Sequence, residues 1–181
     1  MFLRNKNIFL HHIKSAEYFW YILIIQAIII FDQWVKYWVV HNLKTTYATA
    51  PLIQGIVELR YAVNYGAALG MMENYRWIFM TTTFIMIIAA QYLLFSGKLK
   101  RPLLYIPAIC VIGGGIGNMI DRLFRGYVVD MFNFQFVNFA VFNIADIFIT
   151  AGAALIALYV IVSEIEVYKR KKKSNVKIDS N

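Results

Sequence analysis

Charged residues are scarce in this chain of 181 residues: they make up 15% of the sequence, whereas hydrophobic residues make up 60%. A soluble domain usually has about 25% charged residues, so we expect the apolar excess to face lipid instead of enlarging a core. Cysteine is nearly absent as well, and the single Cys110 excludes an intramolecular disulfide. The length fits one domain.

The sequence contains four long apolar stretches. They run from Tyr18 to Val40, Trp77 to Phe95, Leu103 to Ile120 and Val141 to Val162. Each approaches the roughly 20 residues that a helix needs to cross the hydrocarbon of a bilayer. A soluble helical fold could not bury all of these runs in so short a chain. The sequence therefore predicts an all-α membrane protein with four transmembrane helices, in which residues 1–168 form a single domain.

Positive charge is concentrated beside these runs. The formal net charge is +8, and 12 of the 18 Lys and Arg residues fall in the blocks Arg4 to Lys14, Lys98 to Arg101 and Lys169 to Lys177. This positive-inside pattern predicts that both termini are cytoplasmic, and it suits anionic lipid headgroups better than nucleic acid. We expect the basic tail, residues 169–181, to be disordered in the cytoplasm.

The two remaining connections are then expected on the outer side of the membrane. Apolar and polar residues alternate from Val57 to Val63 and again from Phe132 to Phe136, which is typical of half-buried strands. An open sheet edge cannot face hydrocarbon, because its backbone groups would lack hydrogen bonds there. We predict a small extracytoplasmic β-sheet at or above the headgroups.

Acidic residues are the informative side chains. Asp32, Asp121 and Asp146 lie within or at the outer ends of apolar helices, where a carboxylate is costly unless it is paired or faces water. Lys36 lies one helical turn after Asp32 and Arg122 adjoins Asp121, so both acids have an ion-pair partner at hand. We interpret Asp32 and Asp121 as structural.

Asp130 and Asp146 have no basic residue at helical spacing. One follows the third apolar stretch and the other begins the fourth, so both should reach the outer face of the membrane. Two acids at a low-dielectric boundary tend to share one proton, which provides an acid and a base at the same pH. Position alone leaves a catalytic pair, ion pairing and proton transport open.

The sequence lacks the residues that other hydrolase mechanisms would need at the outer face. The serines, at 15, 96, 163, 174 and 180, fall at positions expected on the cytoplasmic side, which excludes a serine hydrolase at the outer face. The three histidines form no His-Glu-x-x-His pair, so we predict no metal site. Gly113 to Gly117 lacks the Lys-Ser/Thr ending of a phosphate loop, and we interpret it as a close helix contact without a cofactor.

Five short motifs between Asp32 and Gly152 resemble the signature blocks of the lipoprotein signal peptidase (signal peptidase II) family, in the family's order. They read Asp32-Gln33-Trp34-Val35-Lys36, Asn64-Tyr65-Gly66-Ala67-Ala68, Gly117-Asn118-Met119-Ile120-Asp121-Arg122, Val128-Val129-Asp130 and Phe142-Asn143-Ile144-Ala145-Asp146.

The resemblance implies an aspartic endopeptidase of the bacterial cytoplasmic membrane, with its active site at the outer face. Its substrate would be a diacylglyceryl-modified prolipoprotein, cleaved before the lipidated cysteine. Asp130 and Asp146 would be catalytic. The residues lining the site would be Asn64, Gly66, Asn118, Arg122 and Asn143, and those bracing the fold Asp32, Lys36 and Asp121.

The resemblance also implies a short interfacial helix beside the sheet and contact with membrane lipid. No cofactor is implied, and we expect a monomer. Two other hypotheses compete with this one. The first is a small proton-coupled transporter with Asp32, Asp121 and Asp146 as its relay, and the second is a non-catalytic assembly factor.

Overall fold

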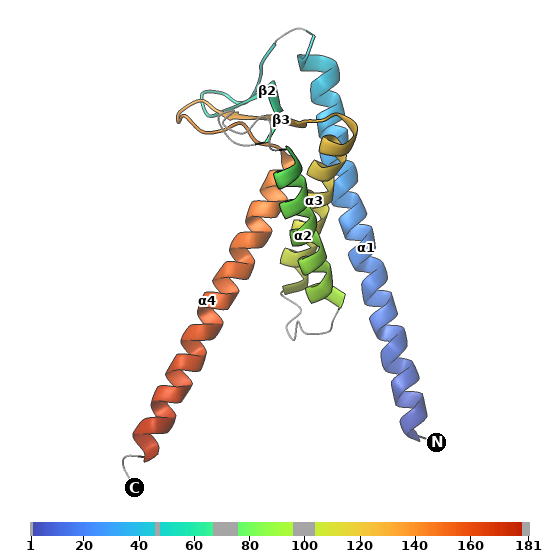
Figure 1. The fold of residues 1–181 in the computed structure, drawn as a ribbon, viewed down its shortest axis with the longest axis vertical. Coiled ribbons are helices and arrows are strands. Elements are labelled where there is room, and N and C mark those ends of the chain that lie inside the picture. The colour runs from blue at the N-terminus through green and yellow to red at the C-terminus, as the bar shows by residue number, and fades with distance from the viewer. Residues whose placement is uncertain (1, 46–47, 67–75, 96–103, 179–181) are drawn as a thin grey trace.

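The computed structural model describes residues 2–45, 48–66, 76–95 and 104–178, which form four long helices and a small sheet (Figure 1). The helices are α1 (Phe2–Leu43), α2 (Arg76–Phe95), α3 (Tyr105–Phe124) and α4 (Ile144–Ile178). Each contains a segment long and apolar enough to cross a membrane: Glu17–Leu43, Trp77–Phe95, Tyr105–Phe124 and Ile144–Lys169. The predicted transmembrane helices are confirmed.

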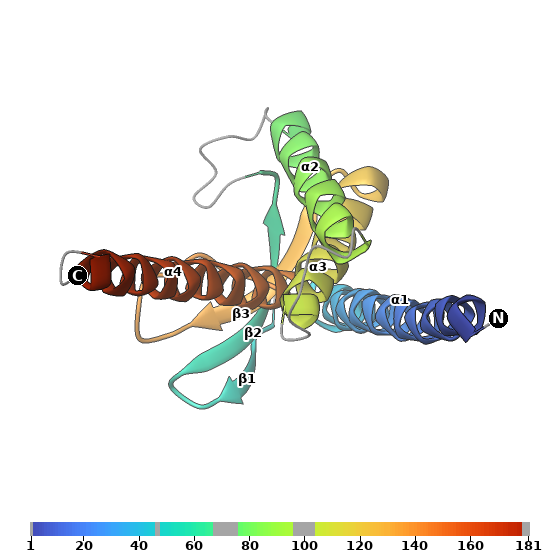
Figure 2. The same ribbon diagram turned by 90° about the horizontal axis from the view of Figure 1, so that it is seen from below.

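α3 is the centre of the helical part. Of its most apolar window, 67% is buried inside the protein, against 11% to 22% for the other three helices. Figure 2 shows α3 in the middle, with α1, α2 and α4 pointing away from it in different directions. The outer three helices therefore present most of their apolar surface to the surroundings, as expected in lipid.

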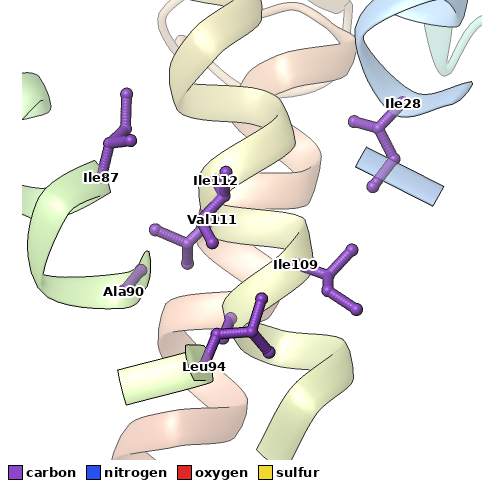
Figure 3. Close-up of a cluster of buried hydrophobic side chains, with 8 residues drawn as sticks. Ile28, Ile87, Ala90, Leu94, Ile109, Val111 and Ile112 are labelled. Carbon is purple, nitrogen blue, oxygen red and sulfur yellow. The ribbon is translucent and has the colours of Figure 1, made fainter. Parts of the chain in front are cut away.

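Small residues of α3 let the other helices approach it closely. A Cβ on Gly114 would lie 2.5 Å from the Ala145 carbonyl oxygen in α4, and one on Gly113 would lie 2.8 Å from the side chain of Ile28 in α1. Below these contacts, Figure 3 shows Ile109 and Ile112 of α3 packed between Ile28 and residues of α2. The predicted role of the glycine run in helix packing is confirmed.

The sheet lies across the ends of the helices, opposite both chain termini (Figure 1). It consists of β1 (Ala50–Ile53), β2 (Val57–Asn64) and β3 (Val128–Phe134), antiparallel and in that order. Its β3 residues Val129 and Met131 are fully buried against Val39 and Leu43 of α1. This packing fixes β3, and with it Asp130, relative to the helices. The predicted small sheet is confirmed.

Two further expectations concerned a short interfacial helix and the basic tail. No short interfacial helix occurs in residues 48–66 or 125–143, and residues 46–47 and 67–75 of the outer segments lie outside the described residues. Residues 169–181 were expected to form a disordered tail, whereas in the structure α4 continues to Ile178. Lys and Arg are good helix formers, and extending an existing helix avoids the cost of nucleation.

Candidate active site

The structure brings Asp130 and Asp146 to the same place from two different elements. Asp130 belongs to β3 and is 2% exposed, whereas Asp146 lies in the first turn of α4. Asn143 contacts both: its side-chain Nδ2 donates to Asp130 Oδ1 at 2.6 Å, and its backbone N–H donates to Asp146 Oδ2 at 3.2 Å. One residue therefore bridges the two carboxyl groups.

The start of α4 is built by a reciprocal cap. The backbone N–H of Asp146 donates to Asn143 Oδ1 at 2.9 Å, while Asp146 Oδ2 accepts from the Asn143 N–H. This is the capping-box pattern, here made by Asn and Asp three residues apart. An acid in the first turn is also favoured by the helix dipole. The cap thus fixes the position of the Asp146 carboxyl group.

Two further asparagines complete the contacts of the acids. Asn64 Nδ2 donates to Asp130 Oδ2 at 3.0 Å, and Asn118 Nδ2 donates to Asp146 Oδ1 at 2.8 Å. The Asn64 amide is itself oriented, because its Oδ1 accepts from the backbone N–H of Gly66 at 3.0 Å. Every carboxyl oxygen of Asp130 and Asp146 therefore has one N–H donor.

Asp130 has an unusual affinity for its proton. Burial, followed by the nearby negative charge of Asp146, raises the pKa of Asp130 to about 7. The hydrogen bonds from Asn143 and Asn64 act in the opposite direction, since they favour the ionised form, but they are outweighed. The pair can therefore hold one proton near neutral pH, which is the state required for joint acid and base catalysis.

The structural residues predicted from the sequence form one buried ion network. Lys36 Nζ lies 2.9 Å from Asp32 Oδ2 and 3.1 Å from Asp121 Oδ2, and all three side chains are 0% exposed. Lys36 also donates to Asn118 Oδ1 at 2.8 Å. The network, which we call the brace, is thus connected to Asp146 through the Asn118 amide.

The brace also holds the backbone next to each acid of the pair. Asp32 Oδ1 accepts from the N–H of Ala145, the residue before Asp146, at 2.9 Å. Asp121 Oδ2 accepts from the N–H of Val129, the residue before Asp130, at 3.1 Å. The ion network therefore positions both β3 and α4 at the site.

Arg122 is close to the acids but is not hydrogen-bonded to them among the described residues. Its side chain is 9% exposed, its guanidinium lies 6.0 Å from the centre of the Phe79 ring, and it is attracted electrostatically to Asp146 and Asp130. Its Nε has no hydrogen-bond partner in the described part of the chain. This places a buried cation with unused donor capacity beside the pair.

A cavity of about 890 Å³ opens beside the two acids. Its wall includes Asn64, Gly66, Asp130 and Asp146, and it then follows one face of α4. The other α4 residues of the wall are Ile147, Thr150, Ala151 and Ala154. A polar end with two acids and a mainly apolar wall is a combination typical of ligand sites. Within the described ranges, no group of three or more His, Cys, Asp or Glu residues could hold a metal.

Sequence reasoning missed several residues of this region. Gln33, quoted in a motif but given no role, donates to the Gly117 carbonyl oxygen at 3.1 Å and to Asp121 Oδ1 at 3.3 Å. Arg60 and Thr150 line the cavity. Thr150 follows Asp146 by one helical turn, so helical periodicity could have found it. Arg60 is separated from Asn64 by an interruption of the β2–β3 register, so strand periodicity alone could not.

Comparisons with known proteins agree with the resemblance. A family model described as signal peptidase II matches residues 24–162. The lipoprotein signal peptidase of Streptococcus thermophilus is 42% identical over 134 residues, which cover 74% of this chain and 87% of that protein. The lipoprotein signal peptidase of Clostridioides difficile is 38% identical over 144 residues, which cover 80% of this chain and 96% of that protein.

Solved structures show the same similarity in three dimensions. A bacterial membrane enzyme determined by the in meso method at 2.3 Å resolution aligns with a TM-score of 0.71 and 28% identity, covering 80% of this chain and 88% of that one. A second, at 1.9 Å, aligns with a TM-score of 0.70 and 30% identity, covering 77% and 91%. Nothing in these matches supports a proton-coupled transporter. The chain belongs to the signal peptidase II family.

Proposed function

We propose that this chain is a membrane-embedded aspartic endopeptidase that removes the signal peptide from diacylglyceryl-modified bacterial prolipoproteins, cutting before the lipidated cysteine. Family membership and the names of its relatives support the reaction. The main structural support for aspartic peptidase chemistry is that Asn143 bridges Asp130 and Asp146 at the polar end of a cavity. A site of this kind holds an acid and a base together without requiring a metal.

The mechanism begins with a water molecule between the two carboxyl groups. Asp146 takes a proton from the water as its oxygen bonds to the carbonyl carbon of the substrate, and Asp130 gives its proton to the carbonyl oxygen. The product of this step is a neutral tetrahedral diol. When the carbon–nitrogen bond breaks, Asp146 returns its proton to the leaving amine and Asp130 recovers one from the diol. The raised pKa of Asp130 supports its role as the initial acid.

The neighbouring residues position the acids and the substrate. Asn64, Asn118 and Asn143 each donate to a catalytic carboxyl group, so they fix its orientation before the substrate binds. Gly66 lines the cavity, where a residue without a side chain leaves room for the substrate backbone. Arg122 supplies positive charge near the two acids, which helps to stabilise charge that develops during the reaction.

The mainly apolar wall along α4 receives the part of the substrate that lies in the membrane. Ile147, Ala151 and Ala154 continue from Asp146 along one face of the membrane-spanning segment. A lipid-modified signal peptide can therefore enter sideways from the bilayer, with its acyl chains in hydrocarbon and its scissile bond beside the acids. The binding energy of the lipid helps to place the bond, so an unmodified precursor is a poor substrate.

We place the protein in the bacterial cytoplasmic membrane, with both termini in the cytoplasm and the site at the outer face. Two observations support this orientation. Both chain ends lie opposite the sheet (Figure 1), and the basic blocks Arg4 to Lys14 and Lys169 to Lys177 belong to the ends of α1 and α4 that carry the termini. We expect the protein to act as a monomer on the lipoprotein within membrane lipid.

The proposal is tested with the purified full chain in detergent and two versions of one prolipoprotein, with and without the diacylglyceryl group. We expect cleavage of the modified precursor only, and mass spectrometry should place the new amino terminus at the lipidated cysteine. Cleavage elsewhere, or equal cleavage of both versions, would contradict the proposed specificity. A reporter fused to the C-terminus tests the orientation, since it should be accessible only from the cytoplasm.

A further inference from the structure

A second hollow adjoins the active-site cavity on the side of the sheet. Its volume is about 590 Å³, and its wall consists of Arg60 on β2 and residues 133–139, which include the end of β3 and the loop after it. The two hollows share Arg60, Phe134, Asn138 and Phe139. The two hollows therefore adjoin at these four residues, and the second one is not lined by any residue of α1 to α4 within the described ranges.

Arg60 lies in the same strand as Asn64, where the active-site cavity adjoins the second hollow. Arg60, Ala62 and Asn64 all belong to β2 and all line the cavity. Asn64 holds Asp130, and Arg60 lies four residues before it. The register with β3 is interrupted between Leu59 and Ala62, so the Cα atoms of Asn64 and Arg60 are at most about 13 Å apart. An extended substrate peptide spans the same distance with about four residues.

The charge of Arg60 is available to a ligand. The side chain is exposed, and no ion pair joins it to an acid in the part of the chain that the structure describes. Its nearest acid along the same strand face, Glu58, is occupied by two amides: Asn133 Nδ2 donates to Glu58 Oε1 at 2.8 Å and Gln135 Nε2 to Glu58 Oε2 at 2.9 Å. A guanidinium at the edge of a polar groove favours a carboxylate partner.

We infer that this second hollow binds the first residues of the lipoprotein after the cleaved bond, and that Arg60 favours substrates with a carboxylate side chain about four residues beyond it. The inference rests on the proposed function. A peptide whose scissile bond lies between Asp130 and Asp146 can leave the site in two directions. One follows the mainly apolar face of α4, which suits the signal peptide, and the other follows the polar groove past Arg60.

An anionic lipid headgroup is a less suitable partner for Arg60. The second hollow is lined by the sheet and its loop, and Asn133, Gln135 and Asn138 contribute amide groups to its wall. Amides can donate to and accept from a peptide backbone, whereas a phosphate needs donors only. The arrangement therefore fits an extended polypeptide better than a lipid.

The test uses lipid-modified precursors that differ at one residue, with Asp, Asn or Lys placed at about the third to fifth position after the cleaved bond. The full chain in neutral phosphatidylcholine vesicles is compared with Arg60→Gln, Arg60→Glu and the control Lys44→Gln. Lys44 is an exposed cation that lies 5.5 Å from the Tyr61 ring and lines neither hollow. We expect the unaltered chain to cleave the Asp substrate with a kcat/KM about twofold to fivefold above the Asn substrate at low salt.

The outcomes separate the inference from its rivals. We expect Arg60→Gln to abolish the preference, Arg60→Glu to reverse it toward Lys, and Lys44→Gln to keep it. Equal cleavage of all substrates by the unaltered chain, or a preference that persists in both Arg60 variants, overturns the inference. If the effect of the Arg60 substitutions on cleavage depends on added anionic lipid and not on the substrate charge, Arg60 binds lipid headgroups. That result also overturns the inference. If no precursor is cleaved at all, the proposed function itself fails.

Discussion

Two pairs of acids lie at the same end of this protein, and they differ in what surrounds them. In the brace, Asp32 and Asp121 share Lys36 at 2.9 Å and 3.1 Å, and none of these side chains is exposed. In the proposed catalytic pair, Asp130 and Asp146 have amide donors but no ion pair among the described residues, and both line a cavity. The two groups therefore differ in their nearest partners: an ammonium lies within ion-pair distance of both brace acids, whereas amides contact the two acids that we propose as catalytic.

The two groups are nevertheless coupled. Each brace acid accepts a hydrogen bond from the backbone N–H of the residue before one acid of the pair, through Ala145 and Val129. The ionised brace thus holds the backbone that carries the proton-sharing pair. Substitutions in the pair should lower activity more than stability, whereas substitutions in the brace should lower both.

The largest effect is expected from Asp130→Asn or Asp146→Asn, each of which removes a proton-transfer group but keeps the shape of the side chain. Cleavage of the lipid-modified precursor should fall by about 10²–10⁴-fold. The free energy of unfolding should change by at most about 1–2 kcal/mol, because the amide retains much of the packing and hydrogen bonding. Kinetics and thermal unfolding in detergent measure the two quantities.

The control for this comparison is Glu58→Gln, which removes an acid of the same sheet that does not line the active-site cavity. It should retain most of the activity. If either Asn variant of the pair cleaved the precursor at the unaltered rate, that residue would have to be removed from the mechanism.

Lys36→Met is expected to cause a large loss of stability. The substitution leaves Asp32 and Asp121 buried at 0% exposure without their shared cation. Breaking a buried ion pair in this way costs about 3–5 kcal/mol, and thermal unfolding in detergent should report it. The matched control Lys44→Met removes an exposed lysine and should unfold like the unaltered chain. A stable Lys36→Met protein with low activity would assign Lys36 to the chemistry instead.

The helices were predictable because a membrane span depends on composition over many residues. Their ends were harder to predict, because apolar runs do not mark helix caps. The fourth run begins at Val141, but α4 begins at Ile144, where the Asn143 side chain accepts the Asp146 N–H. That cap is a local pattern of residues three apart, so a search for capping boxes would have located the start of the helix.

The contacts of the site depend on tertiary structure and could be predicted only in part. The pairing of Asp32 with Lys36 follows from helical spacing, and it is present. The contact from Lys36 to Asn118 joins residues 82 positions apart, and nothing in the local sequence of either one indicates it. Likewise, the position of Arg60 relative to Asn64 could not be predicted from the sequence, because the register of β2 with β3 is interrupted between Leu59 and Ala62.

A smaller effect is expected from Gly114→Ala, at the point where α3 meets the start of α4. The new Cβ would lie 2.5 Å from the Ala145 carbonyl oxygen, a backbone atom next to Asp146. We expect a loss of about 1–3 kcal/mol in stability, with a parallel fall in activity. Gly115→Ala is the control, because its Cβ would meet the flexible side chain of Ile87 at 3.0 Å. Equal effects of both substitutions would show that the approach to Ala145 is not special.

The smallest effect is a change in the pH dependence of cleavage. The mechanism needs the shared proton, and the pKa of Asp130 is about 7, so kcat/KM should fall about tenfold per pH unit as the pH rises above that value. Asn64→Leu removes a hydrogen bond that favours the ionised form of Asp130. The pKa of Asp130 should then rise further, and the alkaline fall in kcat/KM should move to higher pH. A shift to lower pH would show that Asn64 stabilises the protonated carboxyl, which would contradict the assigned hydrogen bond from Asn64 Nδ2 to the Asp130 carboxylate.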